Sequence, residues 1–460
     1  MLVDELRAIV GSDACQTDER ELEPNLTEWR NRFRGRALAM VSPASTQEVS
    51  DVVRVCAAAG AGIVPQGGNT GLCGGAIPDN SGEQVLLSLA KLDCVRAIDA
   101  GDFSMVAEAG CVLANLQQAA VDVGRYFPLS LSAEGSSQIG GNLSTNAGGI
   151  NVIRYGTARQ QALGLEVVLA DGSIIHGLRS LRKDTAGYDL KQLFIGSEGT
   201  LGIITAACLR LYPDPGETAT VLATVPDAGS AVPLLGEMRR TLADRIEAFE
   251  LISSRALDYV SRHISGATLP FDLAGDWYVL IEAAHGGDTE LLANALQDCA
   301  AKNLICDAII AKSMAEADTI WRMRHAISEA QKFRGPSLKH DISIPISRMQ
   351  EFLRRCEDSL RRQEPDALPV IFGHVGDGNL HYNLTVPVEL AEDNERAAAV
   401  TTTIYDLVAE LGGSFSAEHG IGVSKKGYLE RYRGGAELEL MRRLKLALDP
   451  NGTLNPGKVI

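Results

Sequence analysis

Apolar residues in the first part of the chain recur at helical spacing and then give way to short strand-like runs. Residues 45–48, Ser-Thr-Gln-Glu, form a predicted capping box at the start of a helix. The apolar residues that follow lie on one helix face: Val49, Val52, Val53 and Cys56. We expect this helix to end at Gly60 and a strand to follow at 63–65. A β-hairpin is predicted over 165–176, around Asp171-Gly172.

The pattern changes near residue 216. Pro213, Pro215 and Gly216 mark a boundary, because these residues interrupt regular elements. Apolar runs typical of strands then alternate with helical segments that begin near 231 and 289. The predicted strands are 221–225, 246–251, 277–284 and 308–311. We expect an antiparallel sheet with helices on one face, which is an α+β arrangement.

Three loops combine glycine with small hydrogen-bonding residues and contain almost no bulky side chain. They cover residues 66–75, 132–149 and 196–204. Glycine lets backbone amides approach a bound anion, and asparagine, serine and threonine add side-chain hydrogen bonds. A packed core is not built from such residues. We therefore expect these loops to form a surface that holds a large, flat, polar ligand.

A pair of histidines flanks a predicted tight turn in residues 374–381. The turn contains Asp377-Gly378 and would bring His374 and His381 face to face. Glu418 completes a His-His-Glu set with one open coordination position, which is typical of catalytic zinc sites rather than structural ones. The sequence predicts a catalytic divalent metal, with zinc first and cobalt or manganese as alternatives. The competing interpretation is a pair of hydrogen-bonded core histidines beside a hairpin.

A basic helix precedes this hairpin. The pattern predicts a helix from 315 to about 332, in which Arg324 and Ser328 are four residues apart and share a face. Residues 339–346 then alternate as in a strand, with Lys339 on the polar side. Arg324 and Lys339 are therefore candidates to bind a carboxylate. A solvated basic helix remains the open alternative, because further arginines occur nearby.

Charge and cysteine content narrow the class of protein. The chain has 460 residues, which predicts two or three domains, and a formal net charge of −16, which argues against a nucleic-acid-binding protein. Nine cysteines without a CxxC pair indicate reduced thiols, so we expect a cytoplasmic protein. Residues 1–10 lack the apolar core of a secretory signal. We find no apolar run of about 18 residues that would predict a transmembrane helix.

Known nucleotide-binding motifs do not fit. No GxGxxG motif opens a helix after a predicted strand, so a nicotinamide-binding Rossmann unit is not expected. Residues 452–458 match GxxxxGK, but Val459 stands where a P-loop needs serine or threonine.

Six motifs, in order along nearly the whole chain, resemble those of the FAD-linked oxidases of the vanillyl-alcohol-oxidase and para-cresol-methylhydroxylase (PCMH) type. They cover 65–75, 134–149, 196–205, 374–381, 418–422 and 448–458. Within this family the chain is similar to the branch that contains D-lactate dehydrogenase, glycolate oxidase and D-2-hydroxyglutarate dehydrogenase.

The resemblance implies an α+β fold and a division into domains. Residues 1–215 would form a PCMH-type, two-lobed FAD-binding domain. Residues 216–425 would form an antiparallel-sheet α+β cap domain that binds substrate and metal, and 426–460 would pack back on the FAD domain.

The resemblance also implies which residues hold FAD. They are Pro65, Gly67, Gly68, Asn69, Thr70, Gly71, Gly135, Ser136, Gly140, Asn142, Thr145, Asn146, Gly149, Glu198, Gly202, Ile204 and Asn455. Relatives with covalently attached flavin carry a histidine after a Gly-Gly pair. Asn69 stands at that position here, so FAD is expected to be bound non-covalently.

By the same resemblance, Arg324, Ser328 and Lys339 match positions that hold the distal carboxylate in D-2-hydroxyglutarate dehydrogenases. D-lactate has no distal carboxylate and would leave this buried cationic cluster without a partner. The expected activity is oxidation of D-2-hydroxyglutarate, with D-malate second, to the 2-oxo acid by hydride transfer to flavin N5. A D-lactate dehydrogenase or glycolate oxidase subunit of the same family is the alternative.

The hypothesis gives each site residue a task. The metal held by His374, His381 and Glu418 would bind the C2 hydroxyl and the C1 carboxylate of the substrate. His419 would contact the substrate and take the hydroxyl proton as the catalytic base. Asn383, on the strand face of His381, would orient the substrate.

This hypothesis also has consequences for the binding partners of the protein and for the other classes of protein to which it could belong. The electrons would pass to an external acceptor such as an electron-transfer flavoprotein, and the oligomeric state is open, with a homodimer as one option. Two other classes stay open. A zinc hydrolase would leave the glycine-rich loops without a purpose, and a non-catalytic flavin-fold subunit would not need a complete metal set.

Overall fold

The computed structural model describes residues 1–267, 274–286 and 289–460. The chain forms two compact units. Unit 1 contains residues 1–148, 155–214 and 418–460, and unit 2 contains residues 149–154 and 215–417. The C-terminal residues therefore belong to the same unit as the N-terminal residues.

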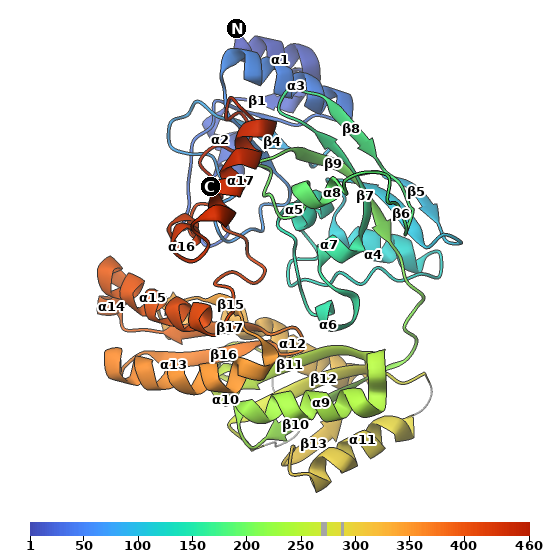
Figure 1. Ribbon diagram of the computed structural model, residues 1–460, viewed down its shortest axis with the longest axis vertical. Helices are drawn as coiled ribbons and strands as arrows, with labels where there is room; N and C mark the ends of the chain where they lie inside the picture. The colour runs from blue at the N-terminus through green and yellow to red at the C-terminus, as the bar shows by residue number, and fades with distance from the viewer. Residues whose placement is uncertain (268–273, 287–288) are drawn as a thin grey trace. The chain divides into compact units, whose positions relative to one another are not determined.

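Unit 1 contains two sheets (Figure 1). The four-stranded sheet has the order β1 (Cys15–Gln16), β2 (Ala39–Val41), β4 (Val85–Ser88) and β3 (Ile63–Gln66). The five-stranded sheet has the order β5 (Val95–Asp99), β6 (Ser104–Glu108), β9 (Ile203–Arg210), β7 (Ala162–Val168) and β8 (Ile174–Gly177). β2, β4 and β3 pair in parallel, whereas the five-stranded sheet is antiparallel throughout.

The helices of unit 1 bury the apolar faces of these sheets. Leu6 and Val49 pack with the strands of the four-stranded sheet, and Leu116 and Leu143 pack with those of the five-stranded sheet. The helices are α1 (Leu2–Val10), α2 (Glu19–Leu26), α3 (Thr46–Ala59), α4 (Leu113–Val121), α5 (Ile139–Ser144), α7 (Ala158–Gln161), α8 (Lys191–Phe194), α16 (Lys426–Tyr432) and α17 (Ala436–Leu448).

The local predictions for this unit are confirmed. The Ser45 hydroxyl caps α3 by accepting a hydrogen bond from Glu48 N, and Gly60 ends the helix with φ 69°. The predicted strand at 63–65 is β3, and the predicted hairpin around residue 171 joins β7 to β8.

Unit 2 is built on one eight-stranded antiparallel sheet. Its order is β13 (Asp307–Ile310), β10 (Thr218–Val225), β12 (Trp277–Ala284), β11 (Ile246–Ser253), β16 (Leu368–His374), β17 (Asn379–Thr385) and β14 (Ser337–Leu338), while β15 (Asp341–Ser343) also pairs with β17. β11 and β16 become neighbours although more than a hundred residues separate them. The predicted α+β class is confirmed by this combination of helices with largely antiparallel sheets.

Helices cover both faces of this sheet, where the sequence predicted one. Ile252 and Phe372 pack toward α10 and α12 on one face, and Tyr382 packs against Phe352 of α13 on the other. All eight residues of β11 are buried, because the strand is covered on both sides. The helices are α9 (Ala231–Leu242), α10 (Ser254–His263), α11 (Thr289–Ala301), α12 (Met314–Ala330), α13 (Met349–Gln363), α14 (Val388–Glu392) and α15 (Asn394–Glu410), with the short α6 (Val152–Tyr155).

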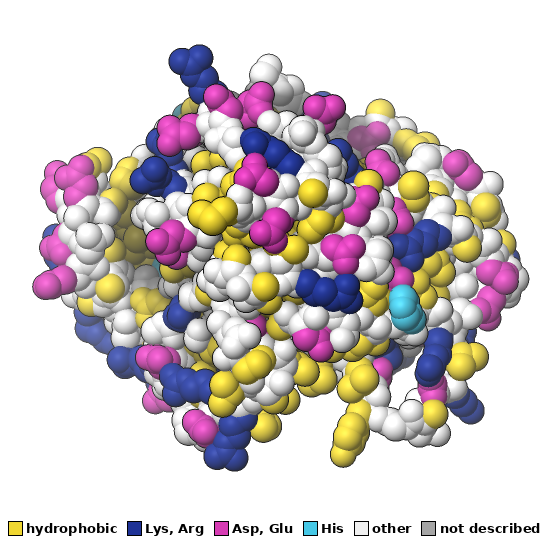
Figure 2. Space-filling model, turned by 90° about the horizontal axis from the view of Figure 1, so that it is seen from above, with side chains coloured by type: hydrophobic (Ala, Val, Ile, Leu, Met, Phe, Trp, Pro, Cys, Tyr) yellow, Lys and Arg dark blue, Asp and Glu magenta, His cyan; other side chains and the backbone are white. Residues whose placement is uncertain are grey.

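Acidic and basic side chains are interspersed on the surface. On the face that Figure 2 shows, Lys and Arg side chains lie between Asp and Glu side chains. Among the described residues, no helix is both long enough and apolar enough to cross a membrane.

Candidate functional site

The glycine-rich loops of unit 1 surround a cavity of about 860 Å³, a volume that includes space open to solvent. The loop after β3, helix α5 and the start of β9 form its walls, and His419 also lines it. The predicted cofactor residues in the lining are Pro65, Gly67, Gly68, Asn69, Thr70, Gly71, Gly140, Asn142, Thr145, Glu198, Gly202 and Ile204.

Glycines in this wall serve two purposes. A Cβ on Gly68 would lie 2.0 Å from the Ser136 carbonyl oxygen, so only glycine allows these two loops to approach each other. A Cβ on Gly71 or Gly141 would meet no protein atom within 4 Å, so these residues leave space in the cavity. The loops are thus closely packed against each other but leave the cavity itself open.

One side chain in the wall of the cavity has a buried oxygen that no hydrogen-bond donor in the described part of the chain contacts. Gln138 Oε1 is buried and accepts no hydrogen bond from the described residues. A buried acceptor without a donor is costly, and a bound ligand with a hydroxyl or imide N–H would satisfy it. Space shaped by glycine together with this acceptor fits FAD, which has a ribityl chain and an imide.

Glu198 joins the C-terminal segment to the cavity wall. Its carboxylate accepts hydrogen bonds from Ile421 N at 2.6 Å and Gly422 N at 2.9 Å. Asn455 Nδ2 donates to the Glu198 carbonyl at 2.7 Å and to the Gly75 carbonyl at 3.0 Å. Burial raises the pKa of Glu198, although the two backbone donors oppose that shift.

Some predicted cofactor residues lie outside the lining of the cavity. Asn146 Oδ1 accepts hydrogen bonds from Thr157 and from the Arg159 backbone, so its amide stabilises the chain beyond α5. The others are Gly135, Ser136, Gly149 and Asn455. Sequence analysis also missed lining residues, of which most lie within or beside the same loops: Gln66, Cys73, Gly75, Ala76, Leu89, Gln138, Gly141, Ser144, Gly199 and Ile203.

The predicted histidine hairpin is present in unit 2. β16 ends at His374, β17 begins at Asn379, and the pair is antiparallel with Phe372 opposite His381. The rings of His374 and His381 are 5.7 Å apart between centroids, at 79° to each other. The tight turn therefore brings the two imidazoles together as expected.

Glu250 of β11 contacts two of the predicted site residues. One carboxylate oxygen accepts a hydrogen bond from Arg324 Nε at 2.7 Å and lies 2.6 Å from Nη2. The other carboxylate oxygen pairs with His374 Nδ1. Burial by itself would raise the pKa of Glu250, but Arg324 and His374 outweigh it and lower the pKa to about 2. Glu250 is not among the residues predicted from the sequence, in which its only signal is a carboxylate within a largely apolar strand.

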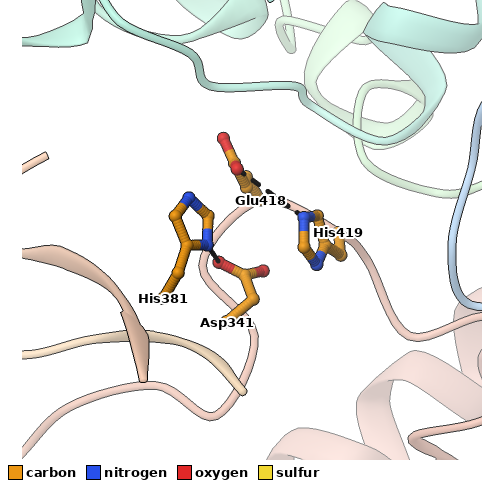
Figure 3. A group of neighbouring side chains, drawn as sticks. All are labelled: Asp341, His381, Glu418 and His419. Carbon is orange, nitrogen blue, oxygen red and sulfur yellow. Dashed lines mark ion pairs between the residues drawn. The ribbon is translucent and has the colours of Figure 1, made fainter. Parts of the chain in front are cut away.

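A second cluster contains His381, Glu418, His419 and Asp341 (Figure 3). Each offers one ligand atom, and these atoms lie within 4.8 Å of one another. Figure 3 shows the Asp341 carboxylate beside the His381 ring and Glu418 beside His419. Glu418 and His419 follow Ala417, whose N–H donates to the Asp341 carbonyl at 3.3 Å. Such a set of imidazoles and carboxylates suits a divalent ion.

This cluster overlaps with the predicted metal ligands without matching them. His381 and Glu418 are in both sets, while Asp341 was not anticipated. His374 is outside the cluster, although its ring is next to that of His381.

The predicted carboxylate-binding residues differ in their surroundings. Arg324 is 7% exposed, so its side chain does not lie on a solvated helix face, which was the alternative interpretation. Ser328 lies one turn further along α12 and Lys339 lies between β14 and β15, and both are partly buried. Asn383 is buried, and its amide donates to Gln331 at 3.1 Å and accepts from His340 N at 3.3 Å.

Comparison with known proteins places the chain in a family. Residues 37–177 match the model of the FAD binding domain, and residues 214–459 match that of the C-terminal domain of FAD linked oxidases. D-2-hydroxyglutarate dehydrogenase of Xanthomonas citri pv. viticola is 39% identical over 99% of this chain and 96% of its own length. The mitochondrial D-2-hydroxyglutarate dehydrogenase of Bos taurus is 39% identical over 96% of this chain and 80% of its own length.

Solved structures support the fold. The structure of p-cresol methylhydroxylase with substrate bound aligns with 100% of this chain and 96% of its own chain. The TM-score is 0.77 and the sequence identity is 18%. The structure of alkyldihydroxyacetonephosphate synthase aligns with 99% of this chain and 85% of its own chain, with a TM-score of 0.75 at 18% identity. The predicted PCMH-type fold is therefore confirmed, and the chain belongs to the FAD-linked oxidases.

Proposed function

We propose that this chain is an FAD-dependent dehydrogenase that oxidises D-2-hydroxyglutarate, with D-malate as a second substrate, to the 2-oxo acid. The observation that carries the proposal is the buried guanidinium of Arg324, which one carboxylate joins to His374 of the hairpin. A cation at this place suits an acid with a second carboxylate. The names of the relatives that match nearly the whole chain agree with this substrate.

FAD is the proposed cofactor of the cavity in unit 1. The loop at 67–71 would hold its pyrophosphate, and Gln138 and Asn142 would face its polar groups. FAD supplies the two-electron acceptor for the reaction when it is bound. Asn69 lines the cavity, and its Nδ2 donates to the Thr27 carbonyl at 3.0 Å; an asparagine cannot form the bond to flavin that a histidine forms, so FAD would be bound non-covalently.

A divalent ion, with zinc first, is the second proposed cofactor. His374, His381 and Glu418 would hold it. Asp341 lies in one cluster with His381 and Glu418, and the ring of His374 is next to that of His381. The Nδ1 atom of His374 faces Glu250, which leaves Nε2 as its ligand atom. A bound dication would lower the pKa of the substrate hydroxyl.

His419 is the proposed base. It lines the cavity in unit 1, belongs to the cluster in Figure 3, and its side chain is 27% exposed. A neutral imidazole in this position would accept the hydroxyl proton as C2 loses its hydride. The role of Asn383 in orienting the substrate stays a prediction.

Arg324, Ser328 and Lys339 would bind the distal carboxylate. Arg324 uses Nε and Nη2 for Glu250, and Nη1 has no hydrogen-bond partner among the described residues. This nitrogen would therefore be available to a substrate carboxylate.

The pairing of Arg324 revises one argument drawn from the sequence. With D-lactate bound, the buried Arg324 would still have a partner, because Glu250 of the protein itself is paired with it. Selectivity for a dicarboxylic acid would then come from the additional hydrogen bonds that its distal carboxylate accepts. A D-lactate dehydrogenase or glycolate oxidase subunit of the same family therefore stays the alternative function.

The remaining assignments concern the cellular setting. The electrons would leave through an external carrier such as an electron-transfer flavoprotein. All nine cysteines are free thiols, which supports a reducing compartment such as the cytoplasm.

Initial rates on D-2-hydroxyglutarate, D-malate and D-lactate test the function directly. We expect the largest kcat/KM for D-2-hydroxyglutarate, with an artificial dye as acceptor, because only dicarboxylic acids engage Arg324. Prior treatment with a chelator should abolish turnover, and added zinc should restore it. A higher kcat/KM for D-lactate would support the alternative, and full activity after chelation would contradict the metal role.

Arg324→Lys tests the distal contact without removing the partner of Glu250. Removal of the whole side chain would leave a buried carboxylate with one partner fewer, which is strongly destabilising. Lysine keeps the charge but not the planar fork, so KM for D-2-hydroxyglutarate should rise roughly tenfold while kcat/KM for D-lactate changes little. Arg322→Lys, on the exposed side of the same helix, is the control. Equal losses on both substrates would argue against a distal carboxylate contact.

A further inference from the structure

The carboxylate of Glu250 is the most enclosed charged group of the sheet in unit 2. Its exposed fraction is 0%, and it lies in the strand whose eight residues are all buried. Burial of a carboxylate costs several kcal/mol unless its partners offset the cost. A well-packed apolar residue at position 250 would make the folded protein at least as stable as the buried glutamate does. The residues that Glu250 contacts must therefore explain why a glutamate, and not an apolar residue, is present at this position.

The fold places these partners on two different elements. β11 pairs with β16 so that Glu250 is opposite His374, and α12 covers the same face of the sheet with Arg324. The guanidinium of Arg324 also lies 4.9 Å above the ring of Phe372. One carboxylate thus joins the end of the histidine hairpin to the helix that carries the proposed substrate cation.

Each oxygen of Glu250 has a separate consequence. The oxygen next to His374 accepts a hydrogen bond from Nδ1–H, which fixes the tautomer in which Nε2 carries a lone pair. The other oxygen holds Nε and Nη2 of Arg324 and leaves Nη1 for a ligand. Both side chains are thereby oriented before any ligand binds.

We propose that Glu250 is a positioning residue that orients a metal-ligating imidazole and the substrate-binding guanidinium at the same time. This inference rests on the proposed function, since it assumes a divalent ion at His374 and a substrate carboxylate at Arg324. Because one side chain serves both groups, a single change at Glu250 should disturb both metal binding and substrate binding.

Glu250→Gln is the test, and Glu282→Gln is its matched control. Glu282 is a partly buried glutamate of the same sheet, on β12, and accepts hydrogen bonds from Trp321 Nε1 at 2.5 Å and Thr220 at 3.4 Å. Both substitutions replace a carboxylate that contacts a residue of α12, but only Glu250 contacts residues of the proposed site. Glutamine at 250 would turn an N–H toward one of its two donors, so one partner loses its acceptor.

The primary readout is zinc affinity, measured by competition with a chromophoric chelator and independent of turnover. We expect Glu250→Gln to weaken zinc binding by about 10- to 100-fold and to raise KM for D-2-hydroxyglutarate, with an unchanged flavin spectrum. Glu282→Gln should retain wild-type values of both quantities, whatever it costs in melting temperature. Equal zinc affinity in the two variants would overturn the proposal.

Two further measurements keep the test decisive. If the glutamine variant does not fold, Glu250→Asp replaces it, because the shorter side chain keeps the charge but cannot reach both partners. Wild-type zinc affinity in that variant would also overturn the proposal. The wild-type protein is measured first: if it binds no zinc, the proposed metal role fails, whereas unequal behaviour of the variants concerns Glu250 alone.

Discussion

Replacement of His381 by alanine is expected to lower turnover of D-2-hydroxyglutarate by roughly 10³-fold, because a metal ion contributes several kcal/mol of charge stabilisation in the transition state. His381 is in the cluster of potential metal ligands, and its ring is adjacent to that of His374. The flavin cavity is lined by residues of unit 1 only, so the bound FAD should be retained. The measurement is kcat with a dye acceptor, together with metal content and the visible spectrum.

His176→Ala is the matched control for this variant. His176 is also a strand residue, but its side chain is 73% exposed and lies in the five-stranded sheet of unit 1. Its loss should change neither metal content nor kcat. If His381→Ala kept both its zinc and its turnover, His381 would not be a metal ligand. If it lost the flavin as well, the effect would be one of folding.

Gly68→Ala is expected to yield protein without bound flavin. A Cβ at this position would lie 2.0 Å from the Ser136 carbonyl oxygen, which is a backbone atom of the neighbouring loop. No rotation of a side chain can relieve such a contact, so the two loops have to separate. The measurement is the FAD-to-protein ratio from the visible spectrum after purification, followed by titration with added FAD.

Gly427→Ala provides the comparison within the same unit. A Cβ on Gly427, in α16, would meet no atom within 4 Å, and alanine is a better helix former than glycine. This variant should bind FAD as the wild type does and should be at least as stable. A normal FAD content in Gly68→Ala would show that FAD binding does not depend on the close approach of these two loops.

The elements that the sequence predicted well are those specified by short segments. The helix after Ser45, the hairpin between His374 and His381, and the helix that carries Arg324 depend on capping residues, turn residues and apolar spacing. The glycine-rich loops were recognisable for the same reason, since the density of small residues is a local property. Their assignment to FAD came from the resemblance to a family, and the matching domain models support it.

The partners of these segments were not predictable from local pattern. Glu250 and His374 are in contact because β11 pairs with β16, and no periodicity in either strand specifies that neighbour. Asp341 joins His381 for a similar reason, through the pairing of β15 with β17. Helices on both faces of the sheet of unit 2 were missed because the apolar runs of its strands do not tell which elements cover them.

By itself, the sequence determined the α+β class and the loops that line the cavity of unit 1, because residue type and spacing over short distances encode them. Of the cluster of potential metal ligands it predicted His381 and Glu418 as ligands, but not Asp341. Only the tertiary structure decided that Arg324 is paired with Glu250, that His374 presents one particular nitrogen, and that Asp341 is near His381. These contacts join side chains from strands and helices far apart in the chain, so they exist only after the sheet of unit 2 has formed.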